Sequence, residues 1–211
     1  EISALISSWI AYGSRVQIIK TLNKIHQEFL ESPTKYIKEK KYQHYQNQEQ
    51  CLYRFYQEKD YFQLCESLHK ILFEENFSCL EKKIQSLVCQ KPTAIEVLEA
   101  ITKIFPNQKG IPQNTKSACK RLCLFLRWMI RKNSEVDFGI WNILQENDLI
   151  IPLDTHVFRI SKQLSLTNRK QADMLSAIQI TEKLKITFPD DPLLGDYALF
   201  GYGVKHQEKT K

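Results

Sequence analysis

The chain has 211 residues and a formal net charge of +6, with 43% hydrophobic and 26% charged residues. These values are typical of an ordinary soluble globular protein with one sizeable domain or two small lobes. The longest uncharged apolar runs are far shorter than the roughly 18 residues that cross a membrane, so we expect no membrane partner. The positive charge gives mild support for a polyanionic partner.

The cysteine pattern indicates reduced thiols. Six cysteines, at positions 51, 65, 79, 89, 119 and 123, form no C-x-x-C pair and have no histidine at zinc-finger spacing. We therefore expect neither a zinc site nor a disulfide framework, which fits a cytosolic protein. Residues 1–5 resemble the interior of a helix and not a basic signal sequence, so we expect the native chain to begin earlier.

Helical periodicity runs through almost the whole first half of the chain. An apolar stripe between Leu5 and Ile25 is interrupted at residues 12–14 (YGS). Residues 35–60 interleave lysines with tyrosines at 42, 45, 53 and 56, as a phosphate-facing surface would require. The alternative, which we favour, is a solvated helical face with half-buried tyrosines. Capping-box spacings at 78–81 and 93–96 predict two further helix starts.

The second half of the chain is also predicted to be helical. Residues 106–115 form a loop rich in turn residues. Helices are expected over about 117–132, 154–165, 171–188 and from Asp191-Pro192 to the glycines at 201–203, with a less regular passage over 135–148. No strand alternation is visible. The sequence therefore predicts an all-α protein, a single unit of two helical lobes with a hinge near 106–116.

Asp154 stands where an apolar run meets the start of a helical pattern, after Pro152. An aspartate there is well suited to cap the helix, because its carboxylate accepts hydrogen bonds from the unpaired N–H groups of the first turn. Taken alone, Asp154 is most simply a cap. However, residues 152–160 (PLDTHVFRI) resemble a segment of the endonuclease III branch of the helix-hairpin-helix DNA glycosylase superfamily. That resemblance implies that Asp154 both caps its helix and faces the sugar of a damaged nucleotide.

A glycosylase that also nicks the strand needs an amine nucleophile, which attacks C1′ of an extruded nucleotide and forms a Schiff base. Lys120 is the best candidate, because the positive end of a helix and neighbouring apolar side chains disfavour a charged amine there. Lys116 is the runner-up. The alternative for Lys120 is an ordinary solvated helix lysine. The mechanism requires no metal and no cofactor, and the chain lacks the four-cysteine cluster of many endonuclease III relatives.

A second resemblance supports Lys120. The usual glycine-containing hairpin before the lysine is missing, and 34 residues separate Lys120 from Asp154. Both features are similar to the archaeal 8-oxoguanine DNA glycosylase branch, whose lysine opens a helix like residues 120–129 (KRLCLFLRWM). Most of residues 1–204 also resembles a bacterial family without an assigned activity, whose members share SACKRL and IPLDTH segments.

The archaeal resemblance also implies a base-binding pocket. Its last helix offers an aspartate and, one turn on, an aromatic ring, which correspond to Asp196 and Phe200. Leu124 and Phe125 follow the lysine by one turn, so we expect them to line the same cavity. Leu124 stands where the archaeal branch has an aromatic ring. The alternative is that Phe200 belongs to the core and Asp196 is an exposed helix residue.

The grip on DNA is expected to come from basic residues that contact phosphates. The candidates are Arg127, Arg131, Arg159 and Lys162, with Lys132, Arg169 and Lys170 behind them. Arg159 is equally well explained by an internal ion pair. Endonuclease III relatives insert a glutamine from the end of the first helix into the duplex; residues 11–15 resemble that place, but Gly13 replaces the glutamine. Tyr12, Arg15 or Gln17 could fill the gap.

Together these observations predict a bifunctional DNA glycosylase and AP lyase for oxidised purines, with 8-oxoguanine as the expected lesion. The expected partner is damaged double-stranded DNA, and the expected state is a monomer in the bacterial cytosol or nucleoid. One alternative keeps the chemistry but changes the damaged base. The other is a catalytically silent nucleic-acid-binding module on the same scaffold.

Overall fold

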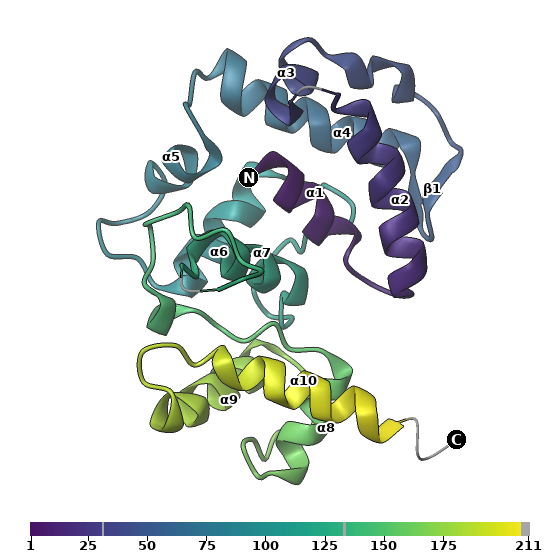
Figure 1. Ribbon diagram of the computed structural model, residues 1–211. Helices are drawn as coiled ribbons and strands as arrows, with labels where there is room; N and C mark the ends of the chain where they lie inside the picture. Colours follow the sequence, from purple (N-terminus) through teal and green to yellow (C-terminus); the bar gives the residue numbers. More distant parts are fainter. Residues whose placement is uncertain (31, 133, 208–211) are drawn as a thin grey trace. The chain divides into compact units, whose positions relative to one another are not determined.

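The computed structural model describes residues 1–30, 32–132 and 134–207, with side chains described as far as Tyr202. Over these residues the protein is mostly helical, with ten α-helices and one short two-stranded sheet (Figure 1). The prediction of an all-α protein is confirmed at this level, apart from the small sheet. None of the helices in the described ranges is long and apolar enough to cross a membrane.

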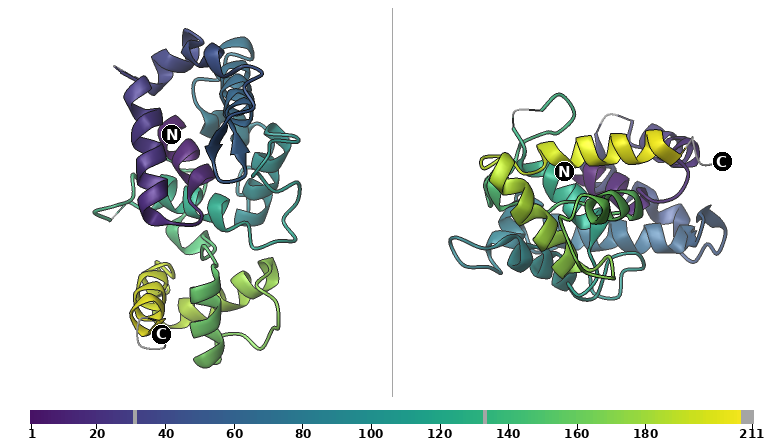
Figure 2. Two further views of the ribbon diagram at one scale, coloured as in Figure 1. Left: turned by 90° about the vertical axis from the view of Figure 1, so that its right-hand side faces the viewer. Right: turned by 90° about the horizontal axis from the view of Figure 1, so that it is seen from below.

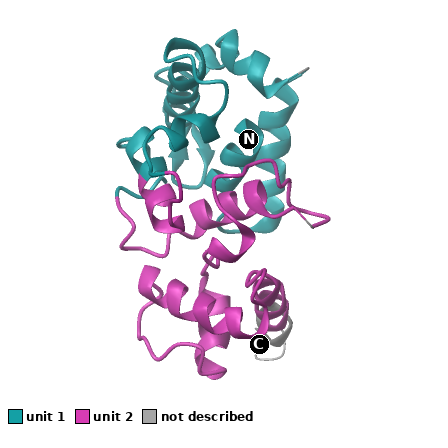
Figure 3. Ribbon diagram, turned by 90° about the vertical axis from the view of Figure 1, so that its left-hand side faces the viewer, with its two compact units in different colours: residues 1–89, 100–113 teal, residues 90–99, 114–211 magenta. Residues whose placement is uncertain are grey.

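The chain divides into two compact units (Figure 3). Unit 1 comprises residues 1–89 and 100–113, and unit 2 comprises residues 90–99 and 114–211. One boundary falls between Gln113 and Asn114, within the loop 106–116 where the sequence suggests a hinge. No feature of the sequence indicates that residues 90–99 group with the C-terminal part of the chain.

Unit 1 is built around the apolar helix α1. Its elements are α1 (Ile2–Ile10), α2 (Arg15–Glu28), α3 (Pro33–Lys38), the 3₁₀-helix η1 (Lys41–Tyr45), β1 (Cys51–Tyr53), β2 (Tyr56–Gln57), α4 (Glu58–His69), the π-helix η2 (Lys70–Glu74) and α5 (Leu80–Gln85). The helix α6 (Ala94–Ile104) contributes its first residues to unit 2 and its last residues to unit 1. In α1 the Trp9 ring stacks on Tyr56 with a centroid distance of 4.1 Å, and its indole N–H donates to the Lys109 carbonyl at 2.7 Å.

The tyrosines of residues 35–60 belong to the core of unit 1. Those at 42, 45, 53 and 56 are at most 4% exposed. The hydroxyl of Tyr42 donates to Glu66 and that of Tyr45 donates to Glu28, so their polar ends are satisfied inside the unit. Both interpretations of this stretch were therefore wrong: the rings form neither a phosphate-facing surface nor a solvated helical face.

The same stretch contains the sheet that the sequence did not predict. Strands β1 and β2 pair in antiparallel fashion, and the two residues Arg54 and Phe55 connect them. Arg54 adopts a left-handed conformation with φ +52°. Because hairpins with two-residue loops are usually marked by glycine or asparagine at such a position, this one leaves no sequence signal.

Unit 2 carries the helices that matter for the predicted site. They are α7 (Lys120–Ile130), the 3₁₀-helix η3 (Glu146–Asp148), α8 (Thr155–Gln163), α9 (Met174–Thr187) and α10 (Leu194–Gln207). Helices α8 and α10 pack against each other and lie side by side in the views of Figures 1 and 2. Residues 134–145, between α7 and η3, are irregular, in agreement with the prediction for this passage.

Several helix ends differ from the predicted ones. Helix α7 begins at Lys120 and not at 117, because Cys119 has a left-handed conformation with φ +45°. Helix α10 continues beyond the glycines at 201–203; Gly201 lies in open space, and a glycine inside an exposed helix costs only about 1 kcal/mol. The capping box at Thr93 is confirmed, since Glu96 N–H donates to its hydroxyl at 3.3 Å. The one at 78–81 is wrong, because Cys79 is the N-cap of α5.

Candidate active site

The candidate nucleophile stands at the first position of a helix. Lys120 opens α7, directly after the left-handed Cys119. No side chain caps this helix end, so the backbone N–H groups of its first turn are not neutralised by a capping oxygen. The side chain of Lys120 is 38% exposed, which leaves its amine accessible from solvent.

Asp154 is the N-cap of α8, as predicted. Its Oδ1 accepts hydrogen bonds from the backbone N–H groups of His156 at 2.9 Å and Val157 at 2.8 Å. The backbone of Asp154 is extended, which is the usual conformation for a capping residue. Because Oδ1 alone makes both capping bonds, Oδ2 is left to serve another purpose.

The fold of unit 2 brings these two side chains together. The Lys120 amine lies 3.4 Å from Asp154 Oδ2, although 34 residues separate them in the chain. The Asp154 side chain is only 11% exposed. Lys116, the runner-up, is exposed in the preceding loop, where its backbone carbonyl accepts a hydrogen bond from Met174. Among the described lysines, Lys120 is therefore the one whose amine meets the capping aspartate.

A second carboxylate lies within electrostatic reach of this pair. Asp196, on α10, is 6% exposed, and its Oδ2 accepts a hydrogen bond from Arg127 at 3.0 Å. Burial raises the pKa of Asp196 from its usual 3.8 to about 6; the positive charges of Arg127 and Lys120 oppose this rise, and the negative charge of Asp154 adds to it. The alternative of an exposed Asp196 is wrong. The site thus contains a second, buried carboxylate whose pKa is raised.

Arg127 in α7 and Arg131 at the C-cap of the same helix have internal side chains and do not form a DNA-binding surface. Arg127 donates to Asp137 at 3.3 Å as well as to Asp196, and Arg131 donates to Asp137 at 2.6 Å and to Asp191 at 2.6 Å. Their side chains are 10% and 4% exposed. The prediction that these arginines contact phosphates is wrong, because their guanidinium groups are buried in ion pairs. What they do is tie α10 and the irregular loop to α7.

The predicted pocket residues fall into two groups. Phe125 is 1% exposed and meets the Trp141 ring edge-on at 5.1 Å, so it belongs to the core and does not line a cavity. Leu124 is half-buried. Phe200 is 47% exposed, and its ring lies 6.5 Å from the His156 ring in an edge-on arrangement. Of the four residues predicted to form the pocket, Asp196 and Phe200 lie on α10, which packs against α8.

The other basic candidates have mixed environments. Lys162 is exposed, with its amine 5.9 Å from the Phe158 ring, and Arg159 is half-buried on the same helix. Arg169 forms an ion pair with Asp173 at 2.5 Å, which also caps α9. Of the four leading phosphate candidates, Lys162 is the one that presents its charge to solvent.

His156 is a further candidate beside the capping aspartate, and the sequence analysis does not single it out. Its Nδ1 is buried and has no hydrogen-bond partner, and it follows the capping aspartate by two residues. A buried ring nitrogen without a hydrogen-bond partner is costly, so its retention calls for an explanation. Its position within the segment 152–160 was the available signal, but histidine there has no distinctive spacing to a second chemical group.

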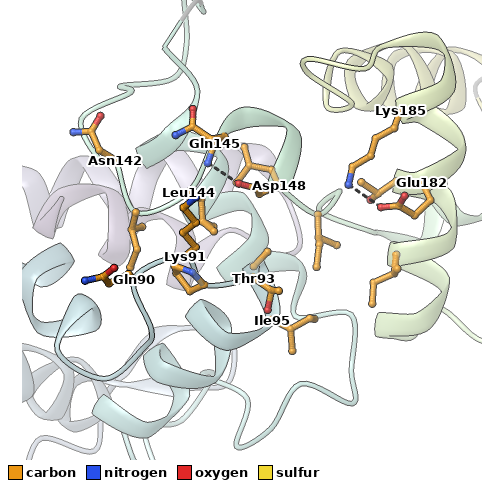
Figure 4. Close-up of a pocket in the computed structure, with 17 residues that line it drawn as sticks. Gln90, Lys91, Thr93, Ile95, Asn142, Leu144, Gln145, Asp148, Glu182 and Lys185 are labelled. Carbon is orange, nitrogen blue, oxygen red and sulfur yellow. Dashed lines mark hydrogen bonds and ion pairs between the residues drawn. The ribbon is translucent and has the colours of Figure 1, made fainter.

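A recess with a volume of about 720 Å³ lies elsewhere in unit 2 (Figure 4). It is lined by residues 90–95, by 142–145 and 148–150, and by part of α9. Within its lining, Lys185 forms an ion pair with Glu182 at 2.7 Å, and Gln145 N–H donates to Asp148 at 2.9 Å. Lys120, Asp154 and Asp196 do not line it, so this recess is separate from the candidate site.

Only one cluster in the described residues has the composition of a metal site. Glu66, His69 and Glu74 offer ligand atoms within 4.8 Å of one another in unit 1. However, the Lys40 amine binds Glu66 at 2.7 Å and lies 4.0 Å from Glu74, so an ammonium group already neutralises these carboxylates. The Lys120 site itself offers no such set of ligands.

Comparison with protein-family models gives one match. The model of the family described as "Protein of unknown function (DUF2400)" matches residues 1–205. The chain belongs to this family. No curated protein and no solved structure matches the chain. The match extends over nearly all of both units, so the Lys120 site and the hairpin of unit 1 lie within the family's shared region.

Proposed function

We propose that this DUF2400 protein is a bifunctional DNA glycosylase and AP lyase of the helix-hairpin-helix type, with a remodelled hairpin. Its substrate would be an oxidised purine, 8-oxoguanine, in double-stranded DNA. The observation that carries the proposal is the approach of the Lys120 amine to Asp154 Oδ2 at 3.4 Å, while Oδ1 of the same carboxylate caps α8. An amine with a base beside it fits the general pattern of a nucleophile that is activated by a neighbouring group.

In the proposed reaction Asp154 accepts the proton that the Lys120 ammonium must lose. The entry of an extruded nucleotide would displace water from the partly exposed lysine. Because loss of hydration disfavours a charged amine, this would promote transfer of its proton to Asp154. The neutral amine then attacks C1′, and the N-glycosidic bond breaks with its electron pair going to the base. Asp154 passes the accepted proton to the departing base. Proton transfer from the attached amine to O4′, with breaking of the C1′–O4′ bond, then opens the sugar ring and gives the protonated Schiff base.

The strand is nicked in a second step. Removal of a C2′ proton from the Schiff base expels the 3′ phosphate by β-elimination, and hydrolysis returns the Lys120 amine. Asp154, whose position is fixed by its two capping bonds, stabilises the cationic sugar that develops as the base departs. The hydrolysis consumes one water molecule, and the other steps use groups of the chain and of the DNA.

Base recognition is assigned to α10. Asp196 Oδ2 is engaged by Arg127, so Oδ1 would accept the N7–H that distinguishes 8-oxoguanine from guanine. The exposed Phe200 ring would stack on the base. Because Arg127 and Arg131 anchor the carboxylates of the α10 region to α7, the base contacts and the Lys120 amine would belong to one rigid assembly.

The test is excision from matched duplexes that carry 8-oxoguanine, an oxidised pyrimidine or an alkylated base, with the DNA products separated by length. The proposal expects native protein to release the base and to give the β-elimination product from the 8-oxoguanine duplex. The Lys120→Gln variant should give neither product. Release of only the pyrimidine or the alkylated base would reassign the substrate. Binding of all three duplexes without any cleavage would favour the catalytically silent module.

A further inference from the structure

Three carboxylates of unit 2 share two guanidinium groups. Arg127 donates to Asp137 Oδ1 at 3.3 Å and to Asp196 Oδ2 at 3.0 Å. Arg131 donates to Asp137 Oδ2 at 2.6 Å and to Asp191 Oδ2 at 2.6 Å. All five side chains are 14% exposed or less, so solvent and salt screen these charges only weakly. When all five groups are ionised, three negative charges meet two positive ones, and the cluster keeps one negative charge in excess.

Asp196 is the position at which this cluster can take up the proton that makes it neutral. Arg127 divides its three donor nitrogens among Asp137, Asp196 and the hydroxyl of Tyr197, which accepts at 2.8 Å. Asp196 therefore receives only part of the charge of this guanidinium group. Burial raises the pKa of Asp196 to about 6, although the charge of Arg127 opposes the rise. A carboxyl group in this environment changes its charge close to neutral pH.

The other ionisable groups around Asp196 come from α7 and α8. Helix α7 contributes Lys120, whose positive charge lowers the pKa of Asp196, and the Cys123 thiol, whose own pKa is raised by burial. Helix α8 contributes Asp154, whose negative charge raises the pKa of Asp196, and His156, whose ring lies 6.5 Å from that of Phe200 on α10. Replacing Asp196 alone separates its protonation from any change in these groups.

A proton changes what Asp196 offers to a purine. Because Arg127 donates to Oδ2, the ionised carboxylate presents Oδ1 as an acceptor for the N7–H of 8-oxoguanine. If the carboxyl is protonated while Oδ2 still accepts from Arg127, the proton is on Oδ1 and two donors face each other. Guanine has an acceptor at N7, so the neutral acid would fit guanine instead.

We propose that the proton on Asp196 controls whether the site distinguishes 8-oxoguanine from guanine, and that Asp137 controls this proton by competing for the charge of Arg127. This rests on the proposed function, which places N7 of the base against Asp196 Oδ1. Asp137 is a positioning residue, since it acts through the guanidinium group. Neutralising Asp137 leaves two carboxylates for two guanidinium groups, so Arg127 would stabilise ionised Asp196 more strongly. The pH at which the distinction is lost should then fall.

The probes are duplexes that contain 2′-fluorinated 8-oxoguanosine or 2′-fluorinated guanosine, which resist cleavage. Their binding is compared by fluorescence anisotropy from about pH 5 to 8, on both sides of the pKa of Asp196. At the upper end native protein should prefer the 8-oxoguanine duplex about tenfold, the effect of one hydrogen bond to a charged group, and at the lower end it should lose this preference. Asp137→Asn should keep the preference to a pH about one unit lower.

Two further variants identify the group that titrates. Asp196→Asn should show no preference at any pH, because its one side-chain oxygen accepts from Arg127 and its amide N–H groups then face the base. The matched control is Asp190→Asn, which removes an exposed carboxylate outside the cluster and should behave as native.

The Asp137 side chain is 0% exposed, so the folding of Asp137→Asn is checked by circular dichroism. Asp191→Asn provides a second test at a more exposed position. It also leaves two carboxylates for two guanidinium groups, and it keeps an oxygen that can accept from Leu193 N–H. It should move the pH profile in the same direction as Asp137→Asn.

The outcomes separate this inference from the proposed activity. It is overturned if native protein shows no preference or a preference that does not change with pH, or if the profile is unchanged in Asp191→Asn and in folded Asp137→Asn. Borohydride trapping on a natural abasic duplex is run in parallel, since that site has no base for Asp196 to contact. If trapping fails while the Asp196-dependent preference holds, the lyase is refuted and the control by Asp196 stands. Trapping together with a preference that is independent of pH gives the reverse.

Discussion

The two oxygens of Asp154 make two contributions that substitutions can separate. Asp154→Asn keeps a side-chain oxygen that can accept from His156 and Val157, whereas Asp154→Ala removes both capping bonds. Loss of an N-cap costs about 1 kcal/mol of unfolding free energy, and asparagine caps as well as aspartate. The ion pair adds no more than about 1 kcal/mol, because 38% of the Lys120 side chain is exposed. Asp154→Asn should therefore be less destabilised than Asp154→Ala.

The rates should follow a different order. Because neither variant can accept a proton from Lys120, both should form the Schiff base about 10²–10⁴-fold more slowly than native protein. Urea denaturation gives the free energies of unfolding, and the time course of borohydride trapping gives the rates. A variant Asp154→Asn that unfolds like Asp154→Ala would refute the assignment of capping to Oδ1. A native rate in Asp154→Asn would refute the assignment of proton transfer to Oδ2.

Three further predictions concern unit 2. Arg131→Ala should lower the free energy of unfolding, measured by urea denaturation, by about 3–5 kcal/mol, because it leaves the Asp137 side chain (0% exposed) without one of its partners. The control Lys162→Ala should change this free energy by less than about 0.5 kcal/mol, and equal effects would contradict the buried ion pairs. The raised pKa of Asp196 means that the folded state holds a proton that the unfolded state has lost between about pH 4 and 6, so stability should fall by about 3 kcal/mol as pH rises through this window. Asp196→Asn should remove this fall, and an unchanged profile would count against the assignment. Phe200→Ala should slow 8-oxoguanine excision about tenfold and leave trapping on an abasic site unchanged, since that site has no base to stack; equal losses on both substrates would rule out a stacking role.

The sequence predicts helix caps correctly where the capping side chain and the N–H groups that it binds are close in the chain. The cap at Asp154 and the box at Thr93 involve a side chain and the N–H groups two or three residues away, and both are present. The approach of Lys120 to Asp154 is a long-range contact. It was expected only because the segments around both residues resemble a known superfamily, and periodicity alone would not have placed them together.

Long-range pairing explains the errors. Arg127 and Arg131 are predicted wrongly as phosphate contacts because their partners, Asp137, Asp191 and Asp196, lie 6 to 69 residues further along the chain. The tyrosines of unit 1 looked half-exposed because their hydroxyl partners come from α2 and α4. The hairpin has no sequence signal because Arg54, and not a glycine, takes the left-handed conformation of its loop. The Arg54 side chain packs against Gly13 and Tyr12, contacts that are distant in sequence.

The central claim is that the Lys120 amine forms a covalent bond with the sugar of a damaged nucleotide. Borohydride trapping on an 8-oxoguanine:C duplex, with native protein, Lys120→Gln and Asp154→Asn side by side, tests it most directly. The account predicts an adduct from native protein that is weaker with Asp154→Asn and absent with Lys120→Gln. An adduct that persists in Lys120→Gln would move the nucleophile to Lys116 or another amine. No adduct from native protein, on this duplex or on one with an abasic site, would contradict the lyase mechanism.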